Sequence, residues 1–143
     1  MVLDERANYV RNAARRRFAG HDFSPLAVRR FLSGVLEVWG VGVDTTRHNL
    51  LLLASELANN AVEHTYAGFA VSIRTVGAGA RVEVHDTEAE LPTLRQPTTG
   101  ADRGWGLMLV DRLASAWGAE PATGGKVVWF ELPLGPDEPV ARP

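Results

Sequence analysis

The stretch from Ser55 to Gly68, SELANNAVEHTYAG, places side chains able to do chemistry in an otherwise apolar segment. On a helix, Glu56 and Asn60 stand four residues apart, so they share one face, one turn from each other. A carboxylate and an amide in such a row could accept a proton and ligate a hard cation such as Mg²⁺, which prefers oxygen ligands. His64 continues the row, whereas Asn59 lies off it. In the alternative interpretation, these side chains are exposed or hydrogen-bond locally.

The residues before this stretch, HNLLLLASEL at 48–57, form a wide apolar face that is typical of a helix largely buried in a core. Burying an amide side chain without partners costs about 1–3 kcal/mol. A helix that only packs against a core would therefore not be expected to carry Asn59 and Asn60. The rest of the chain has to decide between the two interpretations.

Two further patches carry groups that suit nucleotide chemistry. Asp86 ends a predicted strand and begins a long loop, and GWGLMLV at 104–110 places glycines where that loop enters a helix. Free backbone N–H groups at a helix N-terminus attract anions. A short G-x-G is weak evidence by itself, because glycine more often ends a loop for backbone reasons. Together, the three patches could supply a metal ligand, a carboxylate for a base amine and a phosphate cradle.

The elements that must position these patches follow from hydrophobic periodicity. Amphipathic helices are predicted at 24–39, from Ser24-Pro25 to the glycines at 40 and 42, and at 107–116. The long helix begins at the caps Asp44, Thr45 and Thr46 and ends between 65 and 68. Strands are predicted at 14–18, 69–76, 81–85, 117–121 and 126–134, with a loop at 88–102. This order indicates an α+β fold, a two-layer sandwich of a mixed, mainly antiparallel sheet with helices on one face.

The bulk composition fits one small domain. The 143 residues suit a single core at 13–134, between a flexible N-terminus at 1–12 and a disordered, proline-rich tail at 135–143. A net charge of −2 gives no general attraction to nucleic acid or to an anionic membrane. The absence of cysteine excludes disulfides and fits a cytoplasmic location. No apolar run approaches the ~20 residues of a membrane span, and the four histidines lack metal-site spacing.

The three patches resemble motifs of the Bergerat-type ATP-binding fold shared by DNA gyrase, the ninety-kilodalton heat-shock chaperones, histidine kinases and mismatch-repair proteins. Its N box is similar to SELANNAVEH, its two glycine boxes to EVHDTEAELP and RGWGLMLVDRLASAWG, and its last strand to GGKVVWFELPL. The resemblance extends roughly from Phe18 to Leu134. Within this superfamily, the chain is most similar to the small bacterial anti-sigma-factor serine kinases of actinobacterial type.

The resemblance implies a role for each matching residue. Glu56 would be the general base that accepts the proton of an attacking serine hydroxyl, and Asn60 would ligate the Mg²⁺ that bridges the ATP phosphates. Asp86 would accept a hydrogen bond from the adenine amino group. The other implied ATP-binding residues lie in the second glycine box: Arg103, Gly104, Trp105, Gly106 and Leu107. Arg103 is included because its charge suits a phosphate.

The sequence departs from the family pattern near the implied nucleotide. The first glycine box usually reads Asp-x-Gly-x-Gly, whereas residues 86–90 read DTEAE and lack both glycines, which let the backbone approach adenine. Glu63 stands where histidine kinases often carry a basic residue, and Val127 stands where relatives often have threonine. Each lost contact would weaken ATP binding by about 0.5–1.5 kcal/mol.

The function that the resemblance implies is an ATP-binding regulator and serine/threonine kinase of anti-sigma-factor type. With ATP and Mg²⁺, it would phosphorylate a serine of an anti-anti-sigma partner, and it would sequester a sigma factor in the alternative state. A homodimer in the cytoplasm is also implied. The altered first glycine box favours an alternative, a non-catalytic protein-binding regulator on the same fold with weak or no ATP binding. In a third interpretation, an unrelated α+β domain, the three patches would lie far apart.

Overall fold

The computed structural model describes residues 8–10, 12–64, 67–88 and 105–134. Three helices and six strands follow one another in these residues. The strands are β1 (Asn8–Val10), β2 (Ala13–Phe18), β3 (Phe69–Val76), β4 (Gly79–Asp86), β5 (Ala116–Ala122) and β6 (Gly125–Pro133). The helices are α1 (Ser24–Val38), α2 (Thr45–His64) and α3 (Trp105–Leu113). The predicted loop at 88–102 and the predicted tail lie almost entirely outside the described residues.

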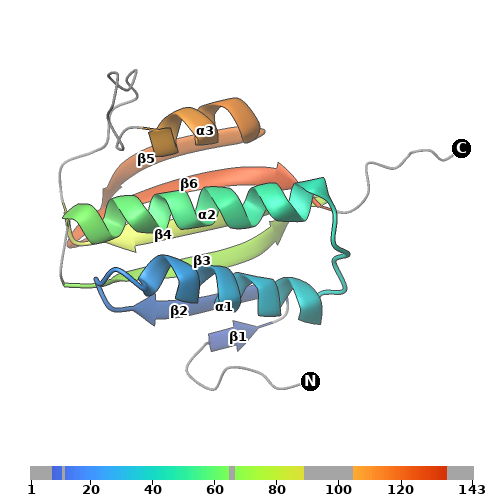
Figure 1. Cartoon of the computed structure of the whole chain (residues 1–143), viewed down its shortest axis with the longest axis horizontal. Coiled ribbons are helices and arrows are strands. Elements are labelled where there is room, and N and C mark those ends of the chain that lie inside the picture. Colours follow the sequence, from blue (N-terminus) through green and yellow to red (C-terminus); the bar gives the residue numbers. More distant parts are fainter. Residues whose placement is uncertain (1–7, 11, 65–66, 89–104, 135–143) are drawn as a thin grey trace, which may run out of the picture.

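The strands form one sheet in the order β1-β2-β3-β4-β6-β5. All three helices lie on the same face of this sheet, with α2 between α1 and α3 (Figure 1). The α+β sandwich predicted from the sequence is therefore confirmed. Every neighbouring pair of described strands is antiparallel, so the sheet is more uniform than the expected mixed one. None of the described helices has the length and apolar character needed to cross a membrane.

The core fills the space between the helices and the sheet. The apolar side chains of α1 and α2 pack on alternate residues of the inner strands, as the period-3.6 and period-2 patterns predict. The ring of Phe18 packs between Phe31 of α1 and Phe69 of β3, with centroid distances of 5.9 Å and 5.6 Å. The leucine run of α2 supplies Leu50 and Leu53, which are fully buried.

Two local features differ from the expectation. Ser24 is the first residue of α1 rather than its cap, and its hydroxyl donates a hydrogen bond to the carbonyl of Ala19. This hydrogen bond ties the beginning of α1 to the loop that precedes it. The segment Asn8–Val10, expected to be loosely held, pairs with β2 as a short edge strand. In contrast, Asp44 caps α2 as expected, because its Oδ1 accepts a hydrogen bond of 2.8 Å from the backbone N–H of Arg47.

The register of β4 with β6 places Asp86 opposite Lys126. Gly125, the residue before Lys126 in β6, allows β4 and β6 to stay paired as far as Asp86. A Cβ atom at Gly125 would lie 1.8 Å from the carbonyl oxygen of Asp86 and 2.8 Å from Cα of Thr87. A residue larger than glycine at 125 would therefore force the two strand ends apart beside Asp86.

Candidate nucleotide site

Four element ends meet at one end of the molecule. The C-terminal half of α2, the beginning of α3, the end of β4 and the beginning of β6 lie at the same end of the sheet (Figure 1). Helix α2 contacts α3, β4 and β6. The three patches selected from the sequence lie on these elements, so the fold brings them together across the helical layer and the sheet. The interpretation as an unrelated domain with scattered patches is therefore wrong.

The first contact of the site joins α2 to the glycine-rich beginning of α3. A Cβ atom placed on Gly106 would lie 3.4 Å from Nδ2 of Asn60 and 3.4 Å from Cβ and Oε1 of Glu56. The backbone of α3 at Gly106 therefore lies against the Glu56–Asn60 row, and an added methyl group would be in van der Waals contact with both side chains. Glu56 and Asn60 are both partly exposed, whereas Asn59 is exposed on another face of α2. These positions agree with the row inferred from helical spacing.

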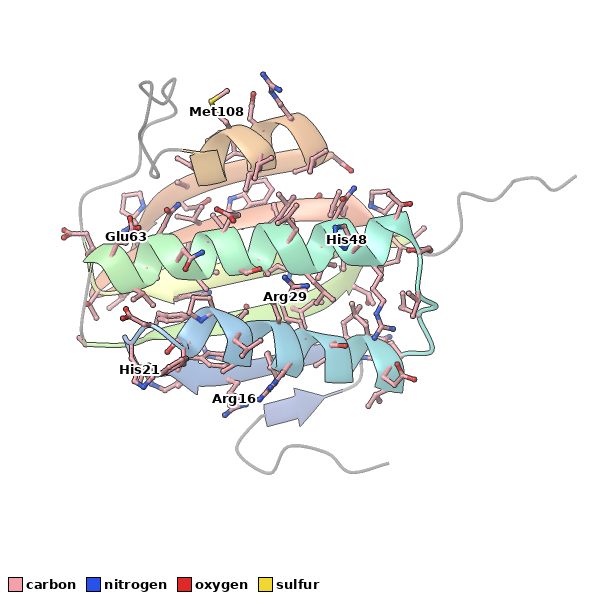
Figure 2. The ribbon with its side chains drawn as sticks, in the orientation of Figure 1. Arg16, His21, Arg29, His48, Glu63 and Met108 are labelled. Atoms are coloured by element: carbon pink, nitrogen blue, oxygen red, sulfur yellow. The ribbon has the colours of Figure 1, made fainter. Side chains whose placement is uncertain are left out.

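The surroundings of Glu56 favour the protonated form of its carboxyl group more strongly than water does for a free glutamate. Burial raises the pKa of the Glu56 carboxyl above its usual range, and the nearby negative charge of Glu63 adds to the rise. Figure 2 shows Glu63 near the C-terminal end of α2, with His48 near the N-terminal end. A carboxylate with a raised pKa is a better proton acceptor, which is the property that a general base needs.

The pKa of Glu56 gives a testable stability effect. A raised folded-state pKa stabilises the fold below the unfolded pKa, and this contribution is lost as the pH rises through the folded pKa. Glu56→Gln should therefore make the protein more stable than the wild type at pH 7, by less than about 1 kcal/mol because the side chain is partly solvated. The difference should shrink below pH 4.5, the reference value of glutamate. Urea unfolding from pH 4 to pH 8 measures it, and a variant that is less stable at pH 7 contradicts the assignment.

The carboxylate of Asp86 is held by an ion pair. Its Oδ1 accepts hydrogen bonds from Nζ of Lys126 at 3.0 Å and from the backbone N–H of Glu88 at 2.9 Å. The side chains of Lys126 and Asp86 are only 5% and 4% exposed. The Asp86 carboxylate also organises the turn that follows β4, because it binds the N–H two residues further on. This turn stands where the family pattern would have its first glycine.

Sequence reasoning missed Lys126, although the strand carried a signal. Alternate residues of β6 face the helices, and the neighbours of Lys126 on that face, Val128 and Phe130, are buried apolar residues. A lysine on the buried face of a strand needs a partner. Its partner, Asp86, is 40 residues away and could not be identified without the register of the sheet.

The second glycine box is only partly described. Arg103 and Gly104 lie outside the described residues, and Trp105 is described only as the first residue of α3. The side chain of Leu107 is 6% exposed and belongs to the hydrophobic core. Leu107 can therefore contribute only its backbone to a nucleotide, and Gly106 is the member of the box whose surroundings support the predicted site.

The fold and the site together define the class of protein. Residues 25–132 match the family model of the histidine kinase-like ATPase domain. Because this match spans most of the chain, the chain belongs to that family, which confirms the superfamily inferred from the three motifs. No curated protein matches the chain significantly.

One solved structure adds to the assignment of the fold. The chain is similar to the crystal structure of the RsbU and RsbW domains of Rv1364c from Mycobacterium tuberculosis, with a TM-score of 0.65 and 22% sequence identity. The similarity covers 85% of this chain and 32% of that chain, so this chain spans about a third of its neighbour's length. At this identity, the likeness establishes a shared fold.

Proposed function

We propose that this protein is an ATP-binding regulator of the anti-sigma-factor kinase type, which phosphorylates a serine of an anti-anti-sigma partner and sequesters a sigma factor. The observation that carries the proposal is the contact of Gly106 with Glu56 and Asn60, at the end of the fold where Asp86 also lies. The family membership supports a nucleotide site, and the similarity of the three motifs to those of anti-sigma-factor kinases supports the class of regulator.

The proposed chemistry needs few side chains, because phosphoryl transfer depends mainly on positioning and charge neutralisation. Glu56, with its raised pKa, accepts the proton of the serine hydroxyl as that oxygen attacks the γ-phosphate. The bond from the γ-phosphorus to the bridging oxygen breaks, and ADP leaves. Asp86 binds the base, and the backbone at the beginning of α3 faces the phosphates.

The residues present fit a Mg²⁺ ion that arrives with the nucleotide. Mg²⁺ usually keeps several waters and binds one or two protein oxygens together with substrate phosphates. The side-chain oxygen of Asn60 suits this arrangement. Within the described part of the chain, no group of three or more histidine, cysteine, aspartate or glutamate side chains could hold a metal ion without phosphates.

A non-catalytic regulator on the same fold is the second candidate. The observation that favours it is the ion pair between Asp86 and Lys126, which engages the carboxylate expected to bind adenine. A partner complex whose affinity ignores both ATP and the Asp86→Ala substitution would support this candidate. The homodimer and the cytoplasmic location stay predictions, and analytical ultracentrifugation of the purified chain tests the first of them.

Calorimetric titration with ATP, with and without Mg²⁺, tests the proposed site. We expect Mg²⁺-dependent binding that Asn60→Ala weakens at least about tenfold, because a charge-assisted metal contact is lost. Asn59→Ala is the matched control, since this neighbouring asparagine is exposed on another face of α2 and should change nothing. Binding that both variants leave intact, or no binding at millimolar ATP, would contradict the assignment.

A further inference from the structure

We propose that the face of the sheet opposite the helices is the interface between two copies of this chain, related by a two-fold axis that runs parallel to the strands along β4. This inference rests on the homodimer that accompanies the proposed function, and it names the surface that forms that dimer. All three described helices lie on one face of the sheet, so no described helix covers the other face (Figure 1). We call this uncovered face the open face.

Alternation along each strand and the register between strands fix which residues the open face carries. In β4, Val82 and Val84 belong to the hydrophobic core, so the residues between and beside them point to the open face. Residues paired across neighbouring strands share one face of a sheet, so the open face is a grid of rows. From β2 to β5, three rows are Arg17, Ala70, His85, Val127 and Glu120; Arg15, Ser72, Glu83, Trp129 and Gly118; and Ala13, Arg74, Arg81, Glu131 and Ala116.

The charges of the open face are separated between its two halves. The half formed by β2 and β3 carries the exposed Arg15, Arg17 and Arg74, and neither strand contains an acidic residue. None of these three arginines forms an ion pair with another described residue. The opposite end carries the exposed Glu120 on β5 and the partly exposed Glu131 on β6. The open face is therefore positive at one end and negative at the other.

The centre of the open face is neutralised within the chain and held in place. Arg81 forms ion pairs with Glu83 at 2.8 Å and with Glu131 at 3.2 Å. Its guanidinium also lies 3.8 Å from the centroid of the Trp129 ring. A Cβ atom at Gly118 would lie 2.9 Å from Cζ2 and Nε1 of Trp129, so glycine is needed for the indole to lie against β5. Tryptophan and arginine are the residues that most often dominate the binding energy of protein interfaces.

A two-fold axis along β4 brings the oppositely charged halves of two copies together. Such an axis exchanges the ends of each row, so Arg17 of one copy faces Glu120 of the other, and the same patch serves both copies. It also sets Ser72, a small side chain, opposite the large Trp129. Sheets that pack face to face keep their strands within about 30° of each other, so the rows stay aligned. An axis across the strands would instead place β2 on β2, and the repulsion between like charges disfavours that arrangement.

Sedimentation equilibrium of the full chain without nucleotide tests the interface through two charge reversals. We expect the wild type to dimerise and Arg17→Glu and Glu120→Arg each to weaken the dimer at least about tenfold, because each sets like charges against each other. Both side chains are exposed, so the fold should persist, which circular dichroism checks. Arg29→Glu is the matched control, because this exposed arginine lies on α1, on the helical side of the sheet, and its reversal should change nothing.

Mixing the two weakened variants then tests the direction of the axis. In the mixed dimer, one contact is the wild-type pair and the other is the same pair with its charges exchanged, so we expect an affinity within about tenfold of the wild type. A dimer that neither reversal weakens, or a mixture that stays monomeric, would overturn the proposed interface. A wild type that is monomeric up to about 1 mM would overturn it together with the homodimer. Calorimetry with ATP tests the nucleotide site separately, so its failure is distinguishable from all of these results.

Discussion

Glu56→Gln is expected to abolish phosphoryl transfer while leaving nucleotide binding almost unchanged. The amide has the shape of the carboxyl group but cannot accept a proton from a serine hydroxyl, and the loss of a general base typically lowers a rate by about 10²–10⁴-fold. Binding should persist because the substitution leaves Asn60 and the close contact with Gly106 in place. The variant should therefore separate chemistry from affinity.

Transfer of label from [γ-³²P]ATP to the serine of an anti-anti-sigma protein of the same organism measures this effect, and calorimetry measures the affinity. Glu63→Gln is the matched control, because it removes a nearby negative charge from α2 without removing the proposed base. Transfer at the wild-type rate by Glu56→Gln would contradict the role of Glu56. Loss of transfer in both variants would assign the effect to the local charge instead.

Asp86→Ala is expected to have the largest effect on stability and to remove base binding as well. The substitution leaves Lys126, whose side chain is 5% exposed, without its carboxylate. Breaking a buried ion pair by removing one partner costs about 3–5 kcal/mol, because the remaining charge is uncompensated. Urea unfolding of the purified variant measures this cost.

The double variant Asp86→Ala with Lys126→Met separates the two consequences. We expect it to recover most of the lost stability, because no buried charge remains, but to stay defective in nucleotide binding. If the loss of unfolding free energy in the double variant equals the sum of the losses in the two single variants, the two side chains are not coupled. Full nucleotide affinity in the double variant would show that Asp86 does not bind the base.

The periodic patterns of the sequence predicted most of the fold. The predicted helix at 24–39, the long helix predicted from the caps at 44–46 to an end at 65–68, and the strands of the hairpin agree with α1, α2, β3 and β4 to within a few residues. Hydrophobic period is a strong signal because each of these elements buries one face. The strand Asn8–Val10 was missed because three residues are too short for any period to appear.

The candidate site was predictable only where its geometry is local. The pairing of Glu56 with Asn60 follows from helical spacing alone, because residues four apart share a face. The contact of Gly106 with that row depends on how α3 packs on α2, and the ion pair of Asp86 with Lys126 depends on the strand register. Such tertiary contacts leave no periodic pattern in the sequence. A lysine on the buried face of β6 was the one visible sign that a partner existed.

The central claim is that a nucleotide binds where α2, α3, β4 and β6 meet, and backbone amide NMR of the ¹⁵N-labelled chain tests it most directly. Titration with Mg-ATP should shift the amides of the C-terminal half of α2, the beginning of α3 and the facing ends of β4 and β6. The amides of α1 and β2, which lie toward the opposite edge of the sheet, should stay unchanged. Shifts confined to α1 and β2, or no shifts at millimolar Mg-ATP, would contradict the account.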